Sequence, residues 1–192
     1  MAWTVIRSGP YIENLHQLFA PKIDEDGTYL FQLPLSNGAI PFIDLDDLAG
    51  YAHWALANPE ESNGLDLGVA TVHASGLDIA NEFTLVTGKP AKYVDLDIDE
   101  WLAATWVKLP NGPDTKVGFV SVKDDGALLQ TFGENFRNWW NLYKASAGNT
   151  GLIQRDYALL DKILPGRVKS TADWIRKVGY TGERLSTLAV LT

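Results

Sequence analysis

The chain has 192 residues, of which 46% are hydrophobic and 11% aromatic, enough for one folded domain with or without a small appendage. Its net charge of −8 argues against direct contact with nucleic acid, because phosphate binding requires a basic surface. The absence of cysteine excludes disulfides and thiol chemistry. No apolar run approaches the roughly 18 residues of a membrane span, and no signal peptide precedes the first expected strand, so we expect a cytoplasmic protein.

The first patterned segment is Trp3–Arg7, which is rich in aromatic and β-branched residues. It hardly alternates between polar and apolar residues, so we predict a strand buried on both faces inside a parallel sheet. The turn that follows contains Ser8, Gly9, Pro10 and Tyr11 and leads into a short helix. Open α/β sheets bind ligands at the carboxyl ends of their strands, so these four residues are candidate ligand contacts. A turn entering a helix explains the glycine and proline equally well.

Two strands are expected next, at Thr28–Leu33 and Ala39–Ile43. The dipeptide Asn37-Gly38 between them is typical of a tight turn, so we predict that these strands form a hairpin. Asp44 is placed to cap a helix. The apolar residues of that helix share one face at helical spacing: Leu45, Leu48, Ala52, Ala55 and Leu56.

Helices dominate the remaining chain, and capping boxes at Ser75 and Ser170 mark two of their starts. Further strands are predicted at Leu65–Thr71, Lys92–Leu96 and Val117–Val122, and further helices at Asp97–Trp106, Leu128–Lys144 and Ile153–Ile163. Asp95, Asp97 and Asp99 alternate with apolar residues and no glycine follows, so a helix cap is preferred to a calcium loop. His16, His53 and His73 lack metal-ligand spacing, so no metal site is predicted.

The sequence contains few motifs that indicate a catalytic or cofactor-binding activity. The chain contains no G-x-G-x-x-G, no Tyr-x-x-x-Lys, no G-x-S-x-G and no H-E-x-x-H. Tyr11 is a candidate catalytic residue because it could donate a proton to a carbonyl, although packing or substrate contact is favoured without a lysine partner. Trp139, Trp140 and Tyr143 are expected to pack in the core. The two tryptophans point roughly 100° apart on a helix, so one of them could line a pocket or an interface.

Four segments, in order, resemble the NmrA-like family, which contains atypical relatives of the short-chain dehydrogenases/reductases. They are WTVIRSGPYIENL (3–15), IPFIDLDDL (40–48), FTLVTGKPA (83–91) and the stretch from RDY (155–157) to WIRKVGY (174–180). The last resembles the fungal branch. The family carries a glycine-rich dinucleotide loop near its amino terminus, which this sequence lacks. It therefore resembles the carboxyl-terminal half of a family member, and we expect a truncated form.

The resemblance implies an α/β fold, made of the carboxyl-terminal part of a Rossmann-like parallel sheet with a small α/β substrate domain. Residues 1–192 form one such region, in which 1–72 end the sheet with a flanking helix and 73–192 supply mainly substrate-side helices. The implied cofactor is NADP or NAD, with its nicotinamide end near Ser8, Gly9, Pro10 and Tyr11. The expected substrate contacts are Asn14, Trp139, Trp140 and Tyr143.

Three functions stay open. The first is an NAD(P)(H)-linked reductase or isomerase acting on a small organic molecule, and the second is a non-catalytic regulator that senses NAD(P). The third is a protein that binds an apolar small molecule through its aromatic residues. The segment Met1–Arg7 has no partner strand before it, so we expect the chain to self-associate through this edge or to be poorly soluble.

Overall fold

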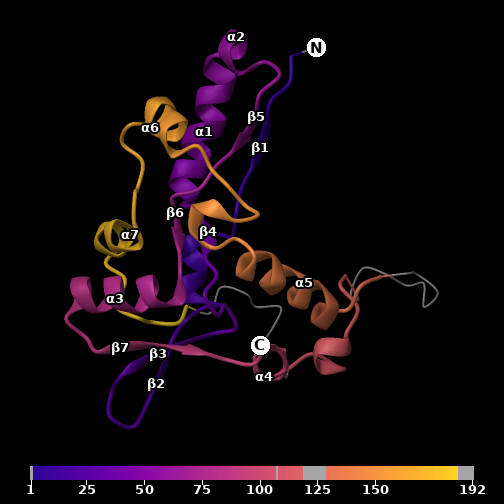
Figure 1. Cartoon of the computed structure of the whole chain (residues 1–192), viewed down its shortest axis with the longest axis vertical. Helices are drawn as coiled ribbons and strands as arrows, with labels where there is room; N and C mark the ends of the chain where they lie inside the picture. The colour runs from indigo at the N-terminus through magenta and orange to yellow at the C-terminus, as the bar shows by residue number, and fades with distance from the viewer. Residues whose placement is uncertain (1, 107, 119–128, 186–192) are drawn as a thin grey trace.

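The architecture is α/β, as predicted. A computed structural model describes residues 2–106, 108–118 and 129–185, and Figure 1 shows its course. One end of the elongated molecule holds β1 (Val5–Arg7), β5 (Asp66–Gly68) and α1 (Leu45–Ala57), together with α2 (Pro59–Ser62) and α6 (Tyr157–Ile163). Strands β1 and β5 run parallel, with Val5 opposite Asp66 and Arg7 opposite Gly68. A small apolar cluster fixes this end: Ile43, Tyr51, Leu67, Val69 and Leu160.

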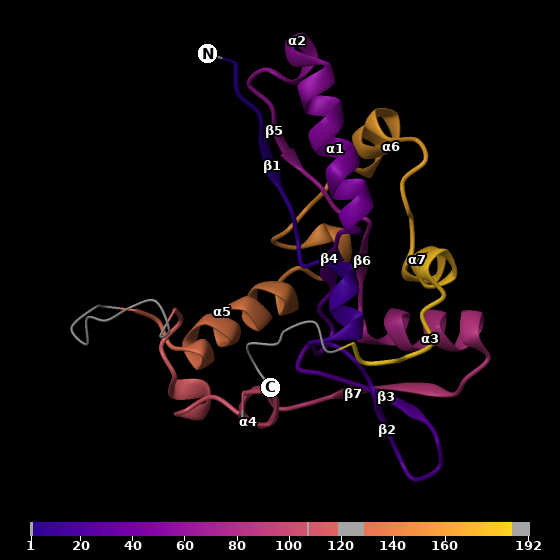
Figure 2. The same cartoon turned by 180° about the vertical axis from the view of Figure 1, so that it is seen from behind.

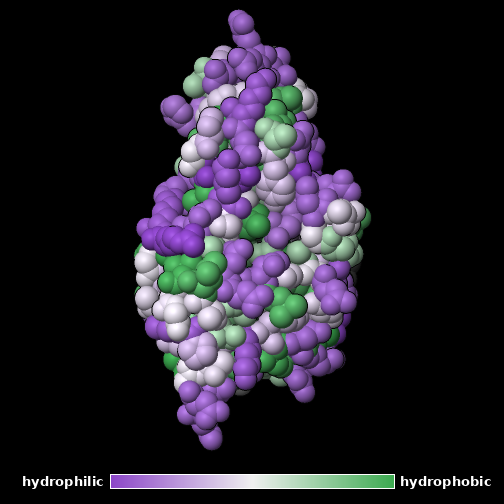
Figure 3. Space-filling model, turned by 60° about the vertical axis from the view of Figure 1, so that its left-hand side comes forward, coloured by the Kyte–Doolittle hydropathy of each residue, from purple (hydrophilic) through white to green (hydrophobic). Residues whose placement is uncertain are grey.

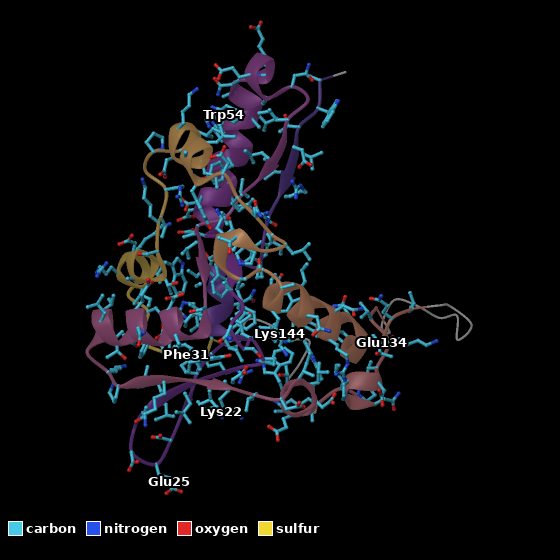
Figure 4. The ribbon with its side chains drawn as sticks, in the orientation of Figure 1. Lys22, Glu25, Phe31, Trp54, Glu134 and Lys144 are labelled. Atoms are coloured by element: carbon cyan, nitrogen blue, oxygen red, sulfur yellow. The ribbon has the colours of Figure 1, made fainter. Side chains whose placement is uncertain are left out.

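The opposite end is built on a three-stranded sheet in the order β2 (Lys22–Ile23), β3 (Tyr29–Leu33) and β7 (Ala91–Asp95). β3 and β7 are parallel, and α3 (Gly76–Thr87) lies along this sheet beside α7 (Thr171–Val178) (Figure 1). In Figure 4, Glu25 marks the far tip of the β2–β3 turn and Trp54 lies on α1, toward the other end of the molecule.

A two-stranded ladder and a 3-10 helix connect the two ends of the molecule. β4 (Ile40–Phe42) pairs with β6 (Val72–Ala74) in an antiparallel ladder, and the 3-10 helix η1 (Ile12–His16) lies beside them. Helix α5 (Phe132–Lys144) extends to one side, near α4 (Ile98–Thr105) (Figure 2). Two further 3-10 turns are η2 (Gly112–Asp114) and η3 (Gly148–Thr150). The predicted division at residues 72 and 73 falls at the start of β6 and stays a prediction.

The main core joins η1, β3, α3, α5 and α7 through large side chains. Its largest fully buried members are Trp140, Trp174, Tyr180, Phe19, Phe31, Phe42 and Phe83. The Tyr180 hydroxyl donates a hydrogen bond to the Leu15 carbonyl at 2.6 Å, so the segment after α7 closes over η1. On the face in Figure 3, apolar residues form separate patches among hydrophilic ones, as expected for an acidic, charged surface.

The predicted helix boundaries are largely confirmed, because they depend on local hydrogen bonds. The Asp44 carboxylate accepts from the backbone N–H of Asp46 at the start of α1, and Ser75 completes a capping box at α3. Gly88 and Gly179 end α3 and α7 with φ of 71° and 68°, a conformation that suits glycine. α5 begins at Phe132, behind a capping box formed by Thr131 and Glu134.

The predicted hairpin is wrong. β3 pairs with β2 and β7, whereas β4 pairs with β6, so the segment 37–38 joins strands of different sheets. Gly38 has another role: a Cβ there would lie 2.4 Å from the carbonyl oxygen of Tyr143. The glycine therefore permits the close approach of the α5 carboxyl end.

One burial prediction is also wrong. β1 is not buried on both faces, because Trp3 is 55% exposed and Val5 is 43% exposed. Among the described residues, β1 pairs with β5 along one edge. On α1, Leu56 is 84% exposed, while Asp47 and Tyr51 are buried. The predicted strand at Val117–Val122 lies partly outside the described residues, and strand β6 was not predicted.

Candidate functional site

The turn after β1 lies at the carboxyl edge of the parallel β1–β5 pair. The N–H of Val69, just beyond β5, donates to the Arg7 carbonyl at 2.9 Å. The Pro10 carbonyl accepts from the N–H of Ile43 at 3.0 Å, and Ile12 donates back to the Ile43 carbonyl at 3.0 Å. The turn is thus fixed to the segment that enters α1, and its position matches the place where open α/β sheets bind ligands.

The four predicted cofactor contacts differ in accessibility. A Cβ at Gly9 would lie 1.8 Å from the Pro41 carbonyl oxygen, so protein already occupies the space beside this glycine. Pro10 is buried, whereas the side chains of Ser8 and Tyr11 face solvent, Tyr11 being 43% exposed. Ser8 and Tyr11 are therefore the two members that a ligand can reach. The cofactor role of all four stays a prediction.

Two guanidinium groups lie near this edge. The Arg155 side chain passes Gly68 at the end of β5, and its Nε donates to the Val69 carbonyl at 3.2 Å. Burial lowers the pKa of Arg155, and the nearby positive charge of Arg7 acts in the same direction. Sequence spacing did not indicate this contact, because Arg155 and Val69 are 86 positions apart. Arg7 is ion-paired with Asp66, whereas Arg155 bonds to backbone carbonyl oxygens, so the positive charge that suits an anionic or electron-rich group at this edge is that of Arg155.

Glu13 is a second residue that the sequence pattern did not single out. Its Oε1 accepts from the backbone N–H of Leu45 at 3.1 Å, at the first turn of α1, while Oε2 is buried without a hydrogen-bond partner among the described residues. Burial raises the pKa of Glu13, and the neighbouring Asp44 adds to the increase, although the Leu45 N–H opposes it. Such a carboxyl group keeps its proton to a higher pH than an exposed glutamate does. A structural reason for the position of Glu13 is the favourable contact of its carboxylate with the positive amino-terminal end of α1.

The predicted substrate contacts lie close to η1, mainly as packing residues. The Asn14 carbonyl accepts from the N–H groups of Gln17 and Phe19 and so shapes the end of η1. Trp140 is fully buried and Tyr143 is 4% exposed, and burial raises the pKa of Tyr143. Trp139 is only partly buried and stacks on Phe19, with ring centroids 5.7 Å apart. Of the three aromatic residues, Trp139 is the one with access to a ligand.

The acidic start of α1 is a structural junction. The Asp44 carboxylate caps the helix and also binds Lys177 of α7, and an Asp47 oxygen accepts from the Val168 N–H at 3.0 Å. Arg167 donates to the Thr71 carbonyl at 2.8 Å. These bonds join α1 to α7 and to the segment before α7, which is itself bonded to the residue before β6, so a structural role accounts for the contacts of this cluster.

Two grooves in the described part of the chain are lined by none of the predicted site residues. A groove of about 360 Å³ lies between β1 and α1, and a second of about 310 Å³ lies between α4 and the start of α5. In the ranges 2–106, 108–118 and 129–185, no cluster of three histidine or acidic side chains could hold a metal ion. Within the same ranges, no helix is long and apolar enough to cross a membrane.

The family model of the NmrA-like family matches residues 1–104, which is more than half of the chain and includes the β1 turn, α1 and α3. The chain belongs to the NmrA-like family. An NAD(P)H azoreductase of Xenophilus azovorans is 31% identical over 100 residues, which are 52% of this chain and 34% of the azoreductase. The NmrA-like chain therefore matches about a third of that relative's length.

Solved structures have a similar fold. A new type of NADPH-dependent quinone oxidoreductase (QOR2) from Escherichia coli superimposes with a TM-score of 0.65 and 20% identity, over 94% of this chain and 56% of that one. NmrA, a negative transcriptional regulator in complex with NADP, gives a TM-score of 0.60 and 16% identity, over 93% of this chain and 52% of that one. These likenesses support the Rossmann-like fold, and the NmrA-like chain spans about half of each neighbour.

Proposed function

We propose that this NmrA-like chain forms the substrate side of an NAD(P)-linked reductase that acts on a small organic molecule. The observation that carries the proposal is the exposure of Ser8 and Tyr11 at the carboxyl edge of the parallel β1–β5 pair. The names of the azoreductase and the quinone oxidoreductase favour a reductase over an isomerase.

The residues present fit the nicotinamide end of the cofactor and not its phosphates. Ser8 and Tyr11 would contact that end, and the charges of Arg7 and Arg155 lie nearby. The 192 residues contain no glycine-rich turn for the pyrophosphate, so in this proposal another glycine-rich segment holds the nucleotide side. When bound, the reduced cofactor supplies a hydride.

The chain's own residues would position the substrate and deliver a proton. Tyr11 is the candidate proton donor, and solvent would return that proton because its side chain is exposed. The substrate would lie against Tyr11, Asn14 and the accessible face of Trp139. Trp140 and Tyr143 would support this contact through packing, because both are buried.

The alternative is a non-catalytic NAD(P)-sensing regulator or small-molecule-binding protein, and the NADP complex of the regulator NmrA favours it. For either function we propose a cytoplasmic member of the fungal branch that makes no direct contact with nucleic acid. We also propose that the chain self-associates through the Met1–Arg7 edge.

The test compares the 192-residue chain with a fusion that carries the glycine-rich half of a family member. We expect isothermal titration to detect saturable NADPH binding by the fusion alone, and the fusion to oxidise NADPH with a quinone or an azo dye. Tyr11→Phe should lower turnover without changing NADPH affinity, whereas Ser8→Trp should weaken NADPH binding and the surface control Lys22→Trp should not. Binding without turnover across the panel would favour the regulator, and no binding by the fusion would contradict the proposal.

A further inference from the structure

Arg155 is a buried arginine that forms no ion pair within the described part of the chain. The residue is 9% exposed, and its side chain bonds to backbone oxygens: Nε donates to the Val69 carbonyl at 3.2 Å and Nη1 to the Gln154 carbonyl at 3.0 Å. Arg167, the other buried arginine of the described residues, pairs with Asp161 at 2.8 Å. A buried charge without a counter-charge is costly, so the burial of Arg155 points to an anionic ligand.

The acidic groups within range of Arg155 do not supply that counter-charge. Asp66 forms an ion pair with Arg7. Tyr143 and Tyr157 lie within range of the guanidinium, but burial raises the pKa of both phenols, that of Tyr157 to about 12, so both are neutral at pH 7. A guanidinium has five N–H donors, and the two bonds to carbonyl oxygens leave three without an acceptor among the described residues.

The position of this guanidinium is fixed by its neighbours. A Cβ built at Gly68 would lie 3.1 Å from Cδ and 3.2 Å from Nη1 of Arg155, so the glycine leaves the space that the guanidinium occupies. Asn149 holds the backbone of Arg155 through two bonds: Oδ1 accepts from its N–H at 2.7 Å, and Nδ2 donates to its carbonyl at 2.9 Å. Figures 1 and 2 both show the segment between α5 and α6 passing beside the end of β1. The charge is therefore held in place at the edge where open α/β sheets bind ligands.

We propose that Arg155 binds the carboxylate of an anionic organic substrate and so selects organic acids over their neutral analogues. One unpaired positive charge matches a monoanion, and a planar guanidinium binds a carboxylate through two parallel N–H···O bonds. A phosphate group matches less well, because it carries about 1.5–2 negative charges at pH 7. Tyr143, a predicted substrate contact, lies within range of the same charge. Arg155 thereby sets the substrate class of the proposed reductase, and this assignment rests on that function.

Titration of the 192-residue chain with benzoate and with benzamide, followed by nuclear magnetic resonance, tests the recognition of charge. The two probes share a ring and differ in charge. We expect a dissociation constant on the order of 1 mM for benzoate and one at least about tenfold higher for benzamide. Arg155→Met should raise the benzoate value at least about tenfold and leave benzamide binding unchanged. The matched control is Arg176→Met, which removes the same charge from an exposed pair with Asp173 and should change benzoate binding less than about twofold.

A second variant separates the position of the guanidinium from its charge. Gly68→Val keeps Arg155 but places a side chain where the guanidinium lies, so it should also weaken benzoate binding, and it tests the site even if Arg155→Met does not fold. Circular dichroism checks the fold of each variant. Equal affinities for benzoate and benzamide, benzoate binding that neither variant weakens, no benzoate binding at about 10 mM, or inorganic phosphate bound as tightly as benzoate would overturn the proposal.

The fusion with a glycine-rich half distinguishes this inference from the reductase proposal. A quinone that carries a carboxylate should have a higher kcat/KM than its methyl ester, and Arg155→Met should remove the difference. Turnover of both quinones with equal kcat/KM would support the reductase and contradict the role of Arg155. Benzoate binding that depends on Arg155, in a fusion without turnover, would support the Arg155 site and contradict the reductase.

Discussion

The Nζ of Lys177 lies 2.7 Å from Oδ2 of Asp44, although 133 positions separate the two residues. The Asp44 side chain is 2% exposed and that of Lys177 is 36% exposed, and Lys177 also lies 2.8 Å from a carboxylate oxygen of Asp46. Partial burial disfavours the charged lysine, but its bonds to the two carboxylates outweigh this effect and raise the pKa of Lys177. The pair fixes α7 to the start of α1.

Lys177→Met should lower the free energy of unfolding by about 1–3 kcal/mol, because it leaves the buried Asp44 carboxylate without its counter-charge. The matched control is Arg176→Met, since Arg176 pairs with Asp173 on the exposed surface at 3.1 Å. That change should cost less than about 1 kcal/mol. Urea denaturation measures both variants, and equal losses would show that the Lys177 pair contributes no more than a surface ion pair.

Asp47 should make stability depend on pH. Burial raises the pKa of Asp47 from 3.8 to about 6 and the charge of Asp44 adds to this, while the Val168 N–H, Lys177 and Arg167 oppose it. The folded state thus holds the proton more tightly than the unfolded state. The stability from this group is fully present below pH 3.8 and is lost as the pH rises through about 6.

The comparison that isolates this effect is wild type against Asp47→Asn. Between pH 5 and pH 7, the wild type should lose about 1 kcal/mol relative to the variant. Denaturant unfolding at the two pH values measures the difference. Parallel pH profiles for the two proteins would mean that Asp47 titrates in the folded state as it does in the unfolded chain.

Gly9→Ala should destabilise the fold by about 3 kcal/mol, because the new Cβ would overlap the Pro41 carbonyl oxygen and force the β1 turn away from β4. The matched control is Gly166→Ala, since no atom lies within 4 Å of a Cβ built at Gly166. That change should stay within about 0.5 kcal/mol. Thermal unfolding distinguishes the two, and a neutral Gly9→Ala would mean that the turn has room for a side chain.

Tyr157→Phe should cost about 1 kcal/mol. The Tyr157 hydroxyl lies 2.7 Å from Nδ1 of His73, and Nε2 of His73 lies 3.0 Å from the Ile153 carbonyl oxygen, so the imidazole bonds to two partners. Tyr11→Phe is the control, because Tyr11 is exposed and should change stability by less than about 0.5 kcal/mol. Similar costs for both would show that the His73 bond contributes nothing.

His73→Gln tests the charge state of the same group. Burial lowers the pKa of His73 from 6.5, so its stabilising contribution is present above pH 6.5 and is lost as the pH falls through the lowered folded value. The wild type should therefore lose stability between pH 7 and pH 5 more steeply than His73→Gln does. Unfolding curves at the two pH values give the comparison, and identical slopes would contradict it.

Local signals in the sequence were sufficient for the helix boundaries. The caps at Asp44 and Ser75 and the terminal glycines Gly88 and Gly179 are correct, because each depends on bonds within a few residues. The same local signals could not predict which strands pair with each other. Asn37-Gly38 has the composition of a hairpin turn, but the burial of Phe31 beneath α3 assigns β3 to β7, about 60 residues further along the chain.

The residues of the candidate site also divide into those that the sequence could predict and those that it could not. The position of Ser8 and Tyr11 could be predicted, because a strand followed by a Gly-Pro turn is a local pattern. Arg155 and Glu13 could not, since each is brought to the edge by bonds to distant backbone groups, at Val69 and Leu45. The burial of Asp47 on α1 through its bond to Val168 could not be predicted from the apolar spacing of the helix.

The bond between Tyr180 and the Leu15 carbonyl has a consequence for the order in which the chain matures. The two residues are 165 positions apart, so η1 lacks its cover until nearly the whole chain has left the ribosome. Contacts of such long sequence separation form late, because loop closure must come first. The turn that carries Ser8 and Tyr11 lies next to η1, so it is synthesised well before the contact that holds η1 in place can form.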